Sequence, residues 1–270
     1  MKVDYLTVKK RRDDIMRIIQ KMGKVDMTTL ENEFKVSPVT LRRDLQYWED
    51  KGAIIRYHGG AKLVQNMIHF DNNEFTNERY KHGIAKYAAR LVEENDTIFI
   101  NTSSTALLII QYIIGKRCTI ITNNAKAIFI KHDPLVQIAL TGGELRFPKE
   151  SLVGDIALNA LNKVVATKCF LGCGGLNAEN GMTTAIMPEV IINETMLQRT
   201  VGQKFIVCDY TKIGLTHSFI TAPIEKIDHI ITDISASDLE LDEIRQRKPD
   251  IIIEKVPPLH TLPSNDEFNY

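Results

Sequence analysis

Short apolar runs alternate with helix-like stretches through most of the chain from residue 80 onward. The runs are rich in Ile, Val, Phe and Thr, and they lie at 97–100, 118–122, 136–141, 168–173, 204–209, 229–233 and 250–254. Helical patterns separate most of them, at 82–95, 104–115, 154–163, 188–199 and 237–246. Strands that are apolar on both sides belong in a parallel sheet covered by helices on both faces. We therefore predict a Rossmann-like, mostly parallel α/β domain over residues 79–256.

A smaller unit precedes this domain. Residues 11–23 carry apolar side chains at helical spacing, and residues 26–34 repeat the pattern over a shorter length. A third helix is predicted from 37, with Ser37 as its N-cap and Pro38 in its first turn. Two β-like runs joined by Gly59-Gly60 follow as a hairpin. We predict a winged helix-turn-helix over 1–64, a polar linker over 65–78 and a flexible tail over 257–270.

The third helix has one apolar stripe, formed by Leu41, Leu45 and Trp48, and a polar face opposite it. Arg, Gln, Thr and Val side chains on such a face can read base edges in a major groove, and cations on the hairpin can reach phosphates. Residues 1–62 hold 14 Lys and Arg against 9 Asp and Glu. The alternative is a merely solvated basic face. The predicted DNA contacts are Ser37, Val39, Thr40, Arg42, Arg43, Gln46, Arg56, His58 and Lys62.

The segments "KRRDDIMRII", "TLRRDL" and "GAIIRYHGGA" closely resemble the winged helix-turn-helix of the DeoR family, bacterial regulators of sugar metabolism. The resemblance continues to about residue 255. It implies a DNA-binding regulator that acts as a repressor. Because one small winged helix rarely supplies enough DNA contacts, a homo-oligomer (dimer or tetramer) is also expected. The resemblance also implies that the second domain senses a phosphorylated sugar or sugar alcohol and is similar in fold to ribose-5-phosphate isomerase.

The segment 101–105 follows the first strand and opens a helix. Hydroxyls beside a helix N-terminus suit a phosphate, although an ordinary Ser N-cap is the plain alternative. Members of the DeoR family carry Asp-x-Gly-Thr/Ser-Thr here, whereas this chain has Asn101 for the Asp and Ser103 for the Gly. Losing the Gly predicts a costlier left-handed turn, and losing the Asp removes a charge beside the ligand.

Other polar or Gly residues follow later strands and are expected to converge on one crevice. Asp209 and Lys212 match the family's Asp-x-Ser/Thr-Lys-x-Gly, and the spacing from Gly172 to Glu189 also matches. Singly, each of these could be a turn residue, a helix-dipole carboxylate or a surface ion pair. The predicted effector contacts are Lys81, Asn101, Ser103, Ser104, Thr105, Thr122, Asn123, Gly143, Gly174, Glu189, Asp209 and Lys212.

Catalysis is not predicted, because the isomerase signatures Asp-Gly-x-Asp-Glu and Lys-Gly-Gly do not occur, nor does a Walker A or GxSxG motif. No metal or cofactor is expected, and the four cysteines are read as reduced core thiols. The N-terminus lacks an apolar leader and no membrane span is evident, which favours a cytoplasmic protein. Two alternatives stay open: a sugar-phosphate isomerase-like enzyme, and a DNA binder whose second domain is degenerate and binds no ligand.

Overall fold

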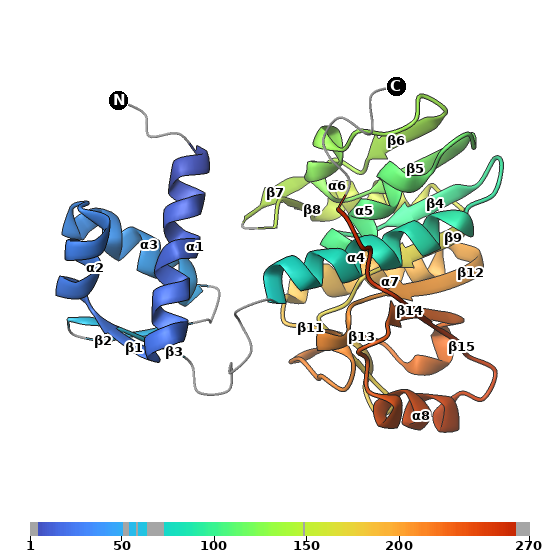
Figure 1. Ribbon diagram of the computed structural model, residues 1–270. Helices are drawn as coiled ribbons and strands as arrows, with labels where there is room; N and C mark the ends of the chain where they lie inside the picture. The colour runs from blue at the N-terminus through green and yellow to red at the C-terminus, as the bar shows by residue number, and fades with distance from the viewer. Residues whose placement is uncertain (1–4, 51–53, 58, 64–72, 148, 263–270) are drawn as a thin grey trace. The chain divides into compact units, whose positions relative to one another are not determined.

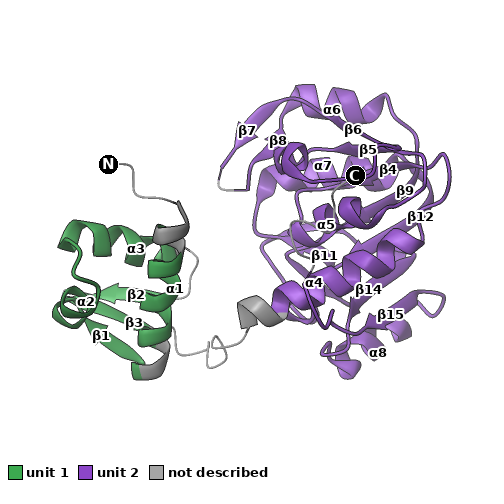
Figure 2. Cartoon of the chain, turned by 45° about the horizontal axis from the view of Figure 1, so that its top comes forward, with its two compact units in different colours: residues 1–75 green, residues 76–270 purple. Residues whose placement is uncertain are grey.

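The computed structural model describes residues 5–50, 54–57, 59–63, 73–147 and 149–262. The chain divides into two compact units, residues 1–75 and residues 76–270 (Figure 2). Helix α4 (Asn73–Arg90) begins inside the segment predicted as a linker (65–78), and residues 65–72 of that segment lie outside the described part. The polar composition of this segment concealed a helix whose apolar residues are concentrated in its second half.

The first unit contains three helices and a small antiparallel sheet (Figure 1). Its helices are α1 (Tyr5–Met22), α2 (Met27–Phe34) and α3 (Pro38–Asp50). Strands β1 (Lys24–Asp26), β2 (Ile54–Tyr57) and β3 (Gly60–Leu63) pair in the order β1-β3-β2. The predicted winged helix-turn-helix is confirmed, and β1 is an additional strand that completes the wing.

A buried carboxylate joins α1 to α3. Asp44 is 1% exposed and accepts hydrogen bonds from Arg11 Nε at 2.7 Å and from Arg12 Nε at 2.9 Å. Arg12 also stacks over the ring of Tyr47, and its carbonyl oxygen accepts a hydrogen bond from Trp48 Nε1. A buried carboxylate needs such partners. The motifs "KRRDDIMRII" of α1, which supplies the two Arg side chains, and "TLRRDL" of α3, which supplies Asp44, therefore also hold the two helices together.

The second unit is built on a seven-stranded sheet with every neighbouring pair parallel, in the order β15-β14-β12-β9-β4-β5-β6. These strands are β4 (Thr97–Ile100), β5 (Cys118–Thr122), β6 (Val136–Leu140), β9 (Ala166–Leu171), β12 (Thr200–Val207), β14 (His229–Asp233) and β15 (Ile252–Val256). Successive strands from β4 to β6 extend the sheet one way, and β9 then returns to the other side of β4. This reversal is the place where ligands bind in open α/β sheets.

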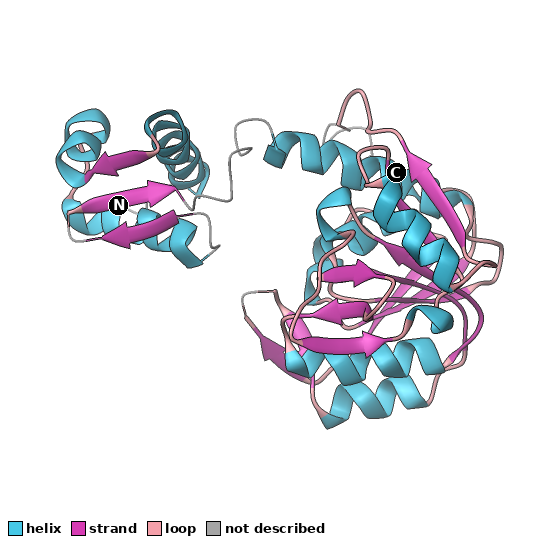
Figure 3. Cartoon of the chain, turned by 90° about the horizontal axis from the view of Figure 1, so that it is seen from below, coloured by secondary structure: helices cyan, strands magenta, loops and turns pink. Residues whose placement is uncertain are grey.

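Helices cover both faces of the sheet (Figure 3). One apolar core lies between the sheet and helices α4 and α5 (Ser104–Tyr112). The other lies between the sheet and helices α6 (Asp155–Asn162), α7 (Met187–Gln198) and α8 (Asp238–Arg247). The predicted α/β class is therefore confirmed. Within the described ranges, no helix is both long enough and apolar enough to cross a bilayer.

Two small antiparallel sheets and three short 3₁₀ helices were not predicted. The sheets are the hairpin β7 (Glu144–Arg146) with β8 (Ser151–Val153), and the trio β10 (Gly175–Asn177), β11 (Gly181–Thr184) and β13 (Phe219–Ala222). The 3₁₀ helices are η1 (Ala125–Phe129), η2 (Tyr210–Lys212) and η3 (Ile224–Lys226). Among these segments, η1, η2, β11 and the β7–β8 loop contribute residues to the cavity described below.

Part of the predicted tail is ordered against α4. Leu259 N donates to Arg79 O at 3.0 Å, and Arg79 Nε donates to Leu259 O at 2.5 Å. Residues 263–270 lie outside the described part of the chain.

Candidate DNA-binding surface and effector cavity

Helix α3 has an apolar side that is buried and a basic side that is free. Leu41, Leu45 and Trp48 are each at most 3% exposed, as the stripe predicted. Arg42 and Arg43 are exposed, and no ion pair to either is found among the described residues. Val39, 56% exposed, lies on the same helix. These three side chains are therefore available to a partner.

The first turn of α3 is capped as the sequence predicted. Thr40 N donates to Ser37 Oγ at 3.3 Å, and the two hydroxyls are 2.9 Å apart. This arrangement fixes where the helix begins, which in turn sets the positions of Val39 and Arg43 along its free side.

The wing residue Arg56 contacts α3. Its Nε donates to Glu49 Oε2 at 2.7 Å, and its guanidinium also donates to Gln46 Oε1. Hydrogen bonds from the Arg56 backbone and side chain lower the pKa of Glu49. Arg56 and Gln46 thus hold the wing to α3 in the free protein, an arrangement that sequence reasoning missed. Lys62 is exposed on β3, and His58 lies outside the described residues.

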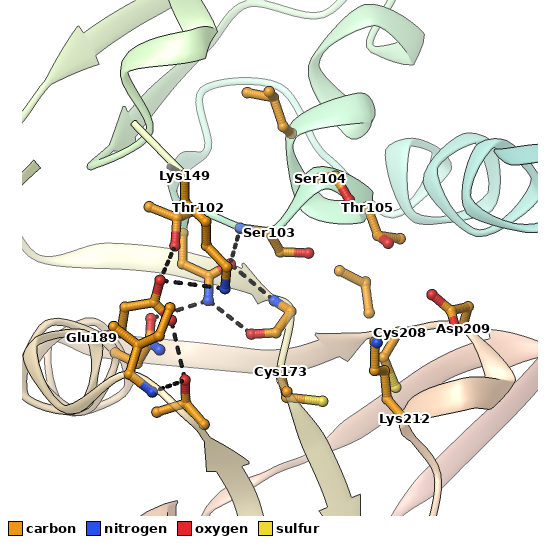
Figure 4. A pocket seen from close by; sticks show the side chains of 18 of the residues that line it. Thr102, Ser103, Ser104, Thr105, Lys149, Cys173, Glu189, Cys208, Asp209 and Lys212 are labelled. Atoms are coloured by element: carbon orange, nitrogen blue, oxygen red, sulfur yellow. Dashed lines mark hydrogen bonds and ion pairs between the residues drawn. The ribbon is translucent and has the colours of Figure 1, made fainter. Parts of the chain in front are cut away.

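A cavity of about 490 Å³ lies at the strand reversal of the second unit (Figure 4). Its walls come from the segments that follow β4, β5, β9 and β12, from the β7–β8 loop and β11, and from α4 and α7. Nine of the twelve predicted effector residues line it, namely Lys81, Asn101, Ser103, Ser104, Thr105, Gly174, Glu189, Asp209 and Lys212. The carboxyl ends of neighbouring parallel strands have brought these distant segments together, as expected.

Asn101 is the centre of a closed hydrogen-bond network. Its Oδ1 accepts from Gly172 N at 3.0 Å and from Ser103 N at 3.2 Å. Its Nδ2 donates to Gly172 O at 2.8 Å and to Asn193 Oδ1 at 3.0 Å. The side chain is 2% exposed and fully paired, so it holds the β4 and β9 ends together and fixes the α5 entry.

The expectation of a strained turn at Ser103 was wrong. Ser103 has φ −65° and ψ 134°, which is ordinary extended backbone, and its Oγ caps α5 by accepting from Ala106 N at 3.4 Å. The first-turn amides of α5 lie at the cavity, since Ser104 and Thr105 line it. A helix N-terminus of this kind carries a partial positive charge and free N–H donors that suit an anion.

Glu189, in the first turn of α7, is 5% exposed and held by three partners. Thr102 Oγ1 and Thr184 Oγ1 each donate to it at 3.2 Å, and Lys149 Nζ is 3.5 Å from its Oε1. A carboxylate fixed by two hydroxyl donors can still accept a ligand hydroxyl, because each of its oxygens has a second lone pair.

Four lysines line the cavity. Lys81 pairs with Glu78, Lys126 with Glu150, and Lys149 with Glu189, whereas Lys212 has no ion pair among the residues described. Asp209 is 3% exposed, caps η2 by accepting from Thr211 N at 3.0 Å, and so fixes the turn that carries Lys212. Lys212 is the cation best placed to take a phosphate.

The structure does not bring Thr122, Asn123 or Gly143 to the cavity. Thr122 Oγ1 accepts from Asn124 N, and Asn123 Nδ2 donates to Leu152 O, so both side chains stabilise the turn after β5. Gly143 has φ +111°, and a Cβ there would lie 2.4 Å from Val153 O, so backbone packing explains this glycine. The segment after β5 does reach the cavity, but through Asn124 and Lys126, the residues that follow this turn.

Several lining residues were not predicted. Some, such as Asn77 and Lys149, lie on segments whose folding the strand pattern did not reveal, whereas Cys208 and Asn193 lie inside a predicted strand and a predicted helix but were not singled out. The unpredicted residues are Asn77, Thr102, Asn124, Lys126, Lys149, Cys173, Thr184, Asn193, Cys208, Thr211 and His217, with several apolar or Gly neighbours. A hydrogen bond with the Cys173 thiol, together with burial, holds the pKa of the Cys208 thiol well above its ordinary value. Cys208 is therefore a poor nucleophile.

Family comparisons agree with this architecture. The model of the DeoR C-terminal sensor domain matches residues 76–234, more than half of the chain, and that of the DeoR-like helix-turn-helix domain matches residues 11–67. The chain belongs to the DeoR family. It is thus a helix-turn-helix transcriptional regulator, as the motifs in α1, α3 and the wing implied.

Curated members of the DeoR family resemble the chain over most of its length. The HTH-type transcriptional regulator GolR of Listeria innocua is 32% identical over 83% of this chain and 89% of its own. The lactose phosphotransferase system repressor of Streptococcus mutans is 31% identical over 84% of this chain and 93% of its own. A ribose 5-phosphate isomerase A from Methanocaldococcus jannaschii aligns at 16% identity over 50% of this chain and 54% of its own, with a TM-score of 0.36.

Proposed function

We propose that this DeoR-family regulator represses a carbohydrate-metabolism operon and is controlled by a phosphorylated sugar or sugar alcohol. The observation that carries the proposal is the cavity at the strand reversal. There the α5 N-terminus and Lys212 offer an anion site, and Glu189 beside them can accept a ligand hydroxyl. The similarity to a lactose phosphotransferase system repressor supports the choice of sugar metabolism and of repression.

The proposed DNA contacts are the free residues of α3, with Arg43 reading a base edge and Lys62 of the wing reaching a phosphate. A bidentate Arg contact typically discriminates by about 1–3 kcal/mol. One such unit offers few contacts, so we propose a homo-oligomer that binds two half-sites. Effector binding would change the spacing of the paired units and hence their fit to the operator.

We further propose that the chain does not transform its ligand. An aldose–ketose isomerase needs a base that can move a proton between two carbons. Glu189 is held by Thr102 and Thr184, and Asp209 caps η2, so both carboxylates have structural partners. A ligand-free, degenerate sensor is the second candidate. It is favoured by Asn101, which replaces the family carboxylate and is fully paired within the protein.

The test is fluorescence anisotropy on DNA from the region upstream of the protein's own gene, at fixed salt, with and without a panel of sugar phosphates. Specific binding that one compound alters would support the proposed regulator. Specific binding that no compound alters, with no compound raising the melting temperature, would favour the degenerate sensor. Turnover of ribose 5-phosphate or a hexose phosphate would overturn the proposal that the chain is not an enzyme.

Two variants separate the DNA and effector roles. Arg43→Ala is expected to weaken specific DNA binding by about 1–3 kcal/mol and to relax one base position, whereas Arg90→Ala, an equal charge change on α4, serves as control. Lys212→Ala is expected to keep DNA binding and lose the effector response. A normal response in that variant would place the phosphate elsewhere.

A further inference from the structure

The β7–β8 hairpin has one exposed edge strand at the rim of the second unit (Figure 2). Within the described ranges, β7 pairs only with β8, and Ser151 of β8 forms a bridge with Asn124 on the other side of the hairpin. All three residues of β7 are exposed. Such an edge presents backbone N–H and C=O groups that can pair with another strand. Neither the DNA-binding role nor the effector role described above uses it.

The charges along β7 are complementary to themselves. Because side chains alternate along a strand, Glu144 and Arg146 lie on one face and Leu145 on the other. Among the described residues, neither charged side chain has an ion pair. If two copies of β7 paired antiparallel about a two-fold axis at Leu145, Glu144 of each copy would lie opposite Arg146 of the partner subunit. Shifting the register by two residues in either direction would set like charges against each other.

Apolar side chains beside β7 fit the same symmetry. Leu145 is 48% exposed, Phe147 is 68% exposed and Ile156 of α6 is 67% exposed. The axis would place Phe147 opposite Gly143 of the partner subunit, where no side chain obstructs the ring. Ile156 lies at that end of the strand, because its Cγ2 is 3.5 Å from the position of a Cβ on Gly142. A stable interface buries about 800 Å² on each partner, so a three-residue ladder needs such apolar contacts beside it.

We propose that two copies of the chain associate through β7, which pairs antiparallel with β7 of the partner subunit about Leu145. The two hairpins then form one four-stranded sheet. The inference rests on the proposed homo-oligomer and deepens it, because it names the surface by which the sensor units meet. Since the same patch is used on both subunits, the contact is isologous and closes as a dimer.

The hairpin that carries this contact also reaches the effector cavity. Lys149, in the loop between β7 and β8, lines the cavity, and its Nζ lies 3.5 Å from Glu189 Oε1. The next residue of the loop, Glu150, pairs with Lys126, another residue of the cavity wall. A ligand that binds Glu189 therefore acts on the loop that adjoins the dimer contact.

The test is sedimentation equilibrium of the full chain, without DNA or effector, over a range of protein concentrations. Glu144→Arg sets positive charges against each other at both facing positions, and Arg146→Glu does the same with negative charges. Each variant alone is expected to weaken self-association about a hundredfold. An equimolar mixture of the two should associate again, because every facing pair then joins opposite charges.

Matched controls are Glu179→Arg, on the β10–β11 turn, and Lys163→Glu, at the end of α6. Both residues are exposed and lie outside the hairpin, and the substitutions make the same changes of charge. Neither control should change self-association, so an effect confined to the β7 variants cannot come from net charge alone.

The outcomes distinguish this inference from the proposed function. A wild type that stayed monomeric at every concentration would overturn the proposed homo-oligomer and this inference with it. An oligomer that neither β7 variant weakened would overturn this inference alone. Stronger association of either variant would also overturn it, because the charges would then keep the edges apart. If both variants dissociated but their mixture did not reassociate, the pairing of Glu144 with Arg146 of the partner subunit would be wrong.

Discussion

At the scale of single residues, Asn101 shows how a departure from a family motif can be built into its surroundings. The amide donates to Gly172 O and Asn193 Oδ1, two acceptors that a carboxylate could not satisfy. Restoring the family residue by Asn101→Asp should therefore lower the free energy of unfolding, by about 1–3 kcal/mol. Denaturant unfolding beside the exposed control Asn159→Asp would measure this. An unchanged stability would mean that the network rearranges at no cost.

A second residue-scale prediction concerns Gly172. A Cβ there would lie 2.0 Å from Ser103 Oγ and 2.2 Å from Ser103 Cβ, so the β9 end and the α5 entry could not both keep their places. Gly172→Ala should cost about 1–3 kcal/mol of stability. Adding Ser103→Gly, the residue that the family motif has, removes the clash and should restore most of that loss. If the double variant were no more stable than Gly172→Ala, the added methyl group would clash with atoms other than those of Ser103.

A buried ion pair at the opposite end of the sheet gives a pH-dependent prediction. Burial opposes ionisation of Asp96, but hydrogen bonds from Lys168, Thr167 and the Glu93 N–H outweigh it, and the pKa of Asp96 is lowered. Its ionisation therefore stabilises the fold above its unfolded-state pKa, and this contribution is lost as pH falls through the lower folded-state value.

Lys168→Met should remove about 3 kcal/mol of stability at pH 7, because it leaves Asp96 buried without its cation. The difference from wild type should shrink as pH falls through the lowered folded-state pKa of Asp96, where the carboxyl becomes protonated in both proteins. Unfolding curves measured across pH, with the exposed Lys163→Met as control, would test this. If the stability difference between the two proteins stayed constant with pH, the loss would not arise from the ionisation of Asp96.

At the scale of elements, sequence patterns identified strands and helices that bury a continuous apolar face. Strands such as 97–100 and 118–122 were predicted at their observed bounds, because apolar composition on both sides defines them. The first half of α4 and the hairpin β7–β8 were missed. Residues such as Asn73 and Glu144 give no apolar period, so tertiary contacts alone decide their structure.

The contact between α4 and the C-terminal segment gives a prediction at this scale. A Cβ at Gly83 would lie 2.3 Å from Pro257 O, a backbone atom that can yield only if the segment moves. Gly83→Ala should therefore destabilise the second unit by about 1–3 kcal/mol, although Ala favours a helix more than Gly does. Lys86→Ala, at an exposed α4 position, is the control. Stabilisation by Gly83→Ala would show that the segment is not held against the helix.

At the scale of the whole molecule, the sequence predicted only the part of the site that lies at the ends of neighbouring parallel strands. Motifs at strand ends converge when the strands are neighbours, so Asn101, Gly174 and Lys212 meet after β4, β9 and β12. Strand order cannot be derived from periodicity. Thr122 also ends a strand beside β4, but its hydroxyl is used by the turn after β5, which the sequence does not reveal. Asn77 and Lys149 were beyond prediction, since they enter from segments without a sequence pattern.

The two units have separate apolar cores, and this predicts how the protein unfolds. Ile15, Leu41 and Trp48 belong to a core confined to residues 15–61, whereas the cores of the sensor unit begin at Ile84. Leu41→Ala should cost about 2–5 kcal/mol, and the loss should fall on the first unit alone. Calorimetry should show one unfolding transition shifted down and the other unmoved. DNA binding should weaken, while sugar-phosphate binding measured below the lower transition should be unchanged. A single transition, moved as a whole, would mean that the two units unfold cooperatively and that their cores are not independent.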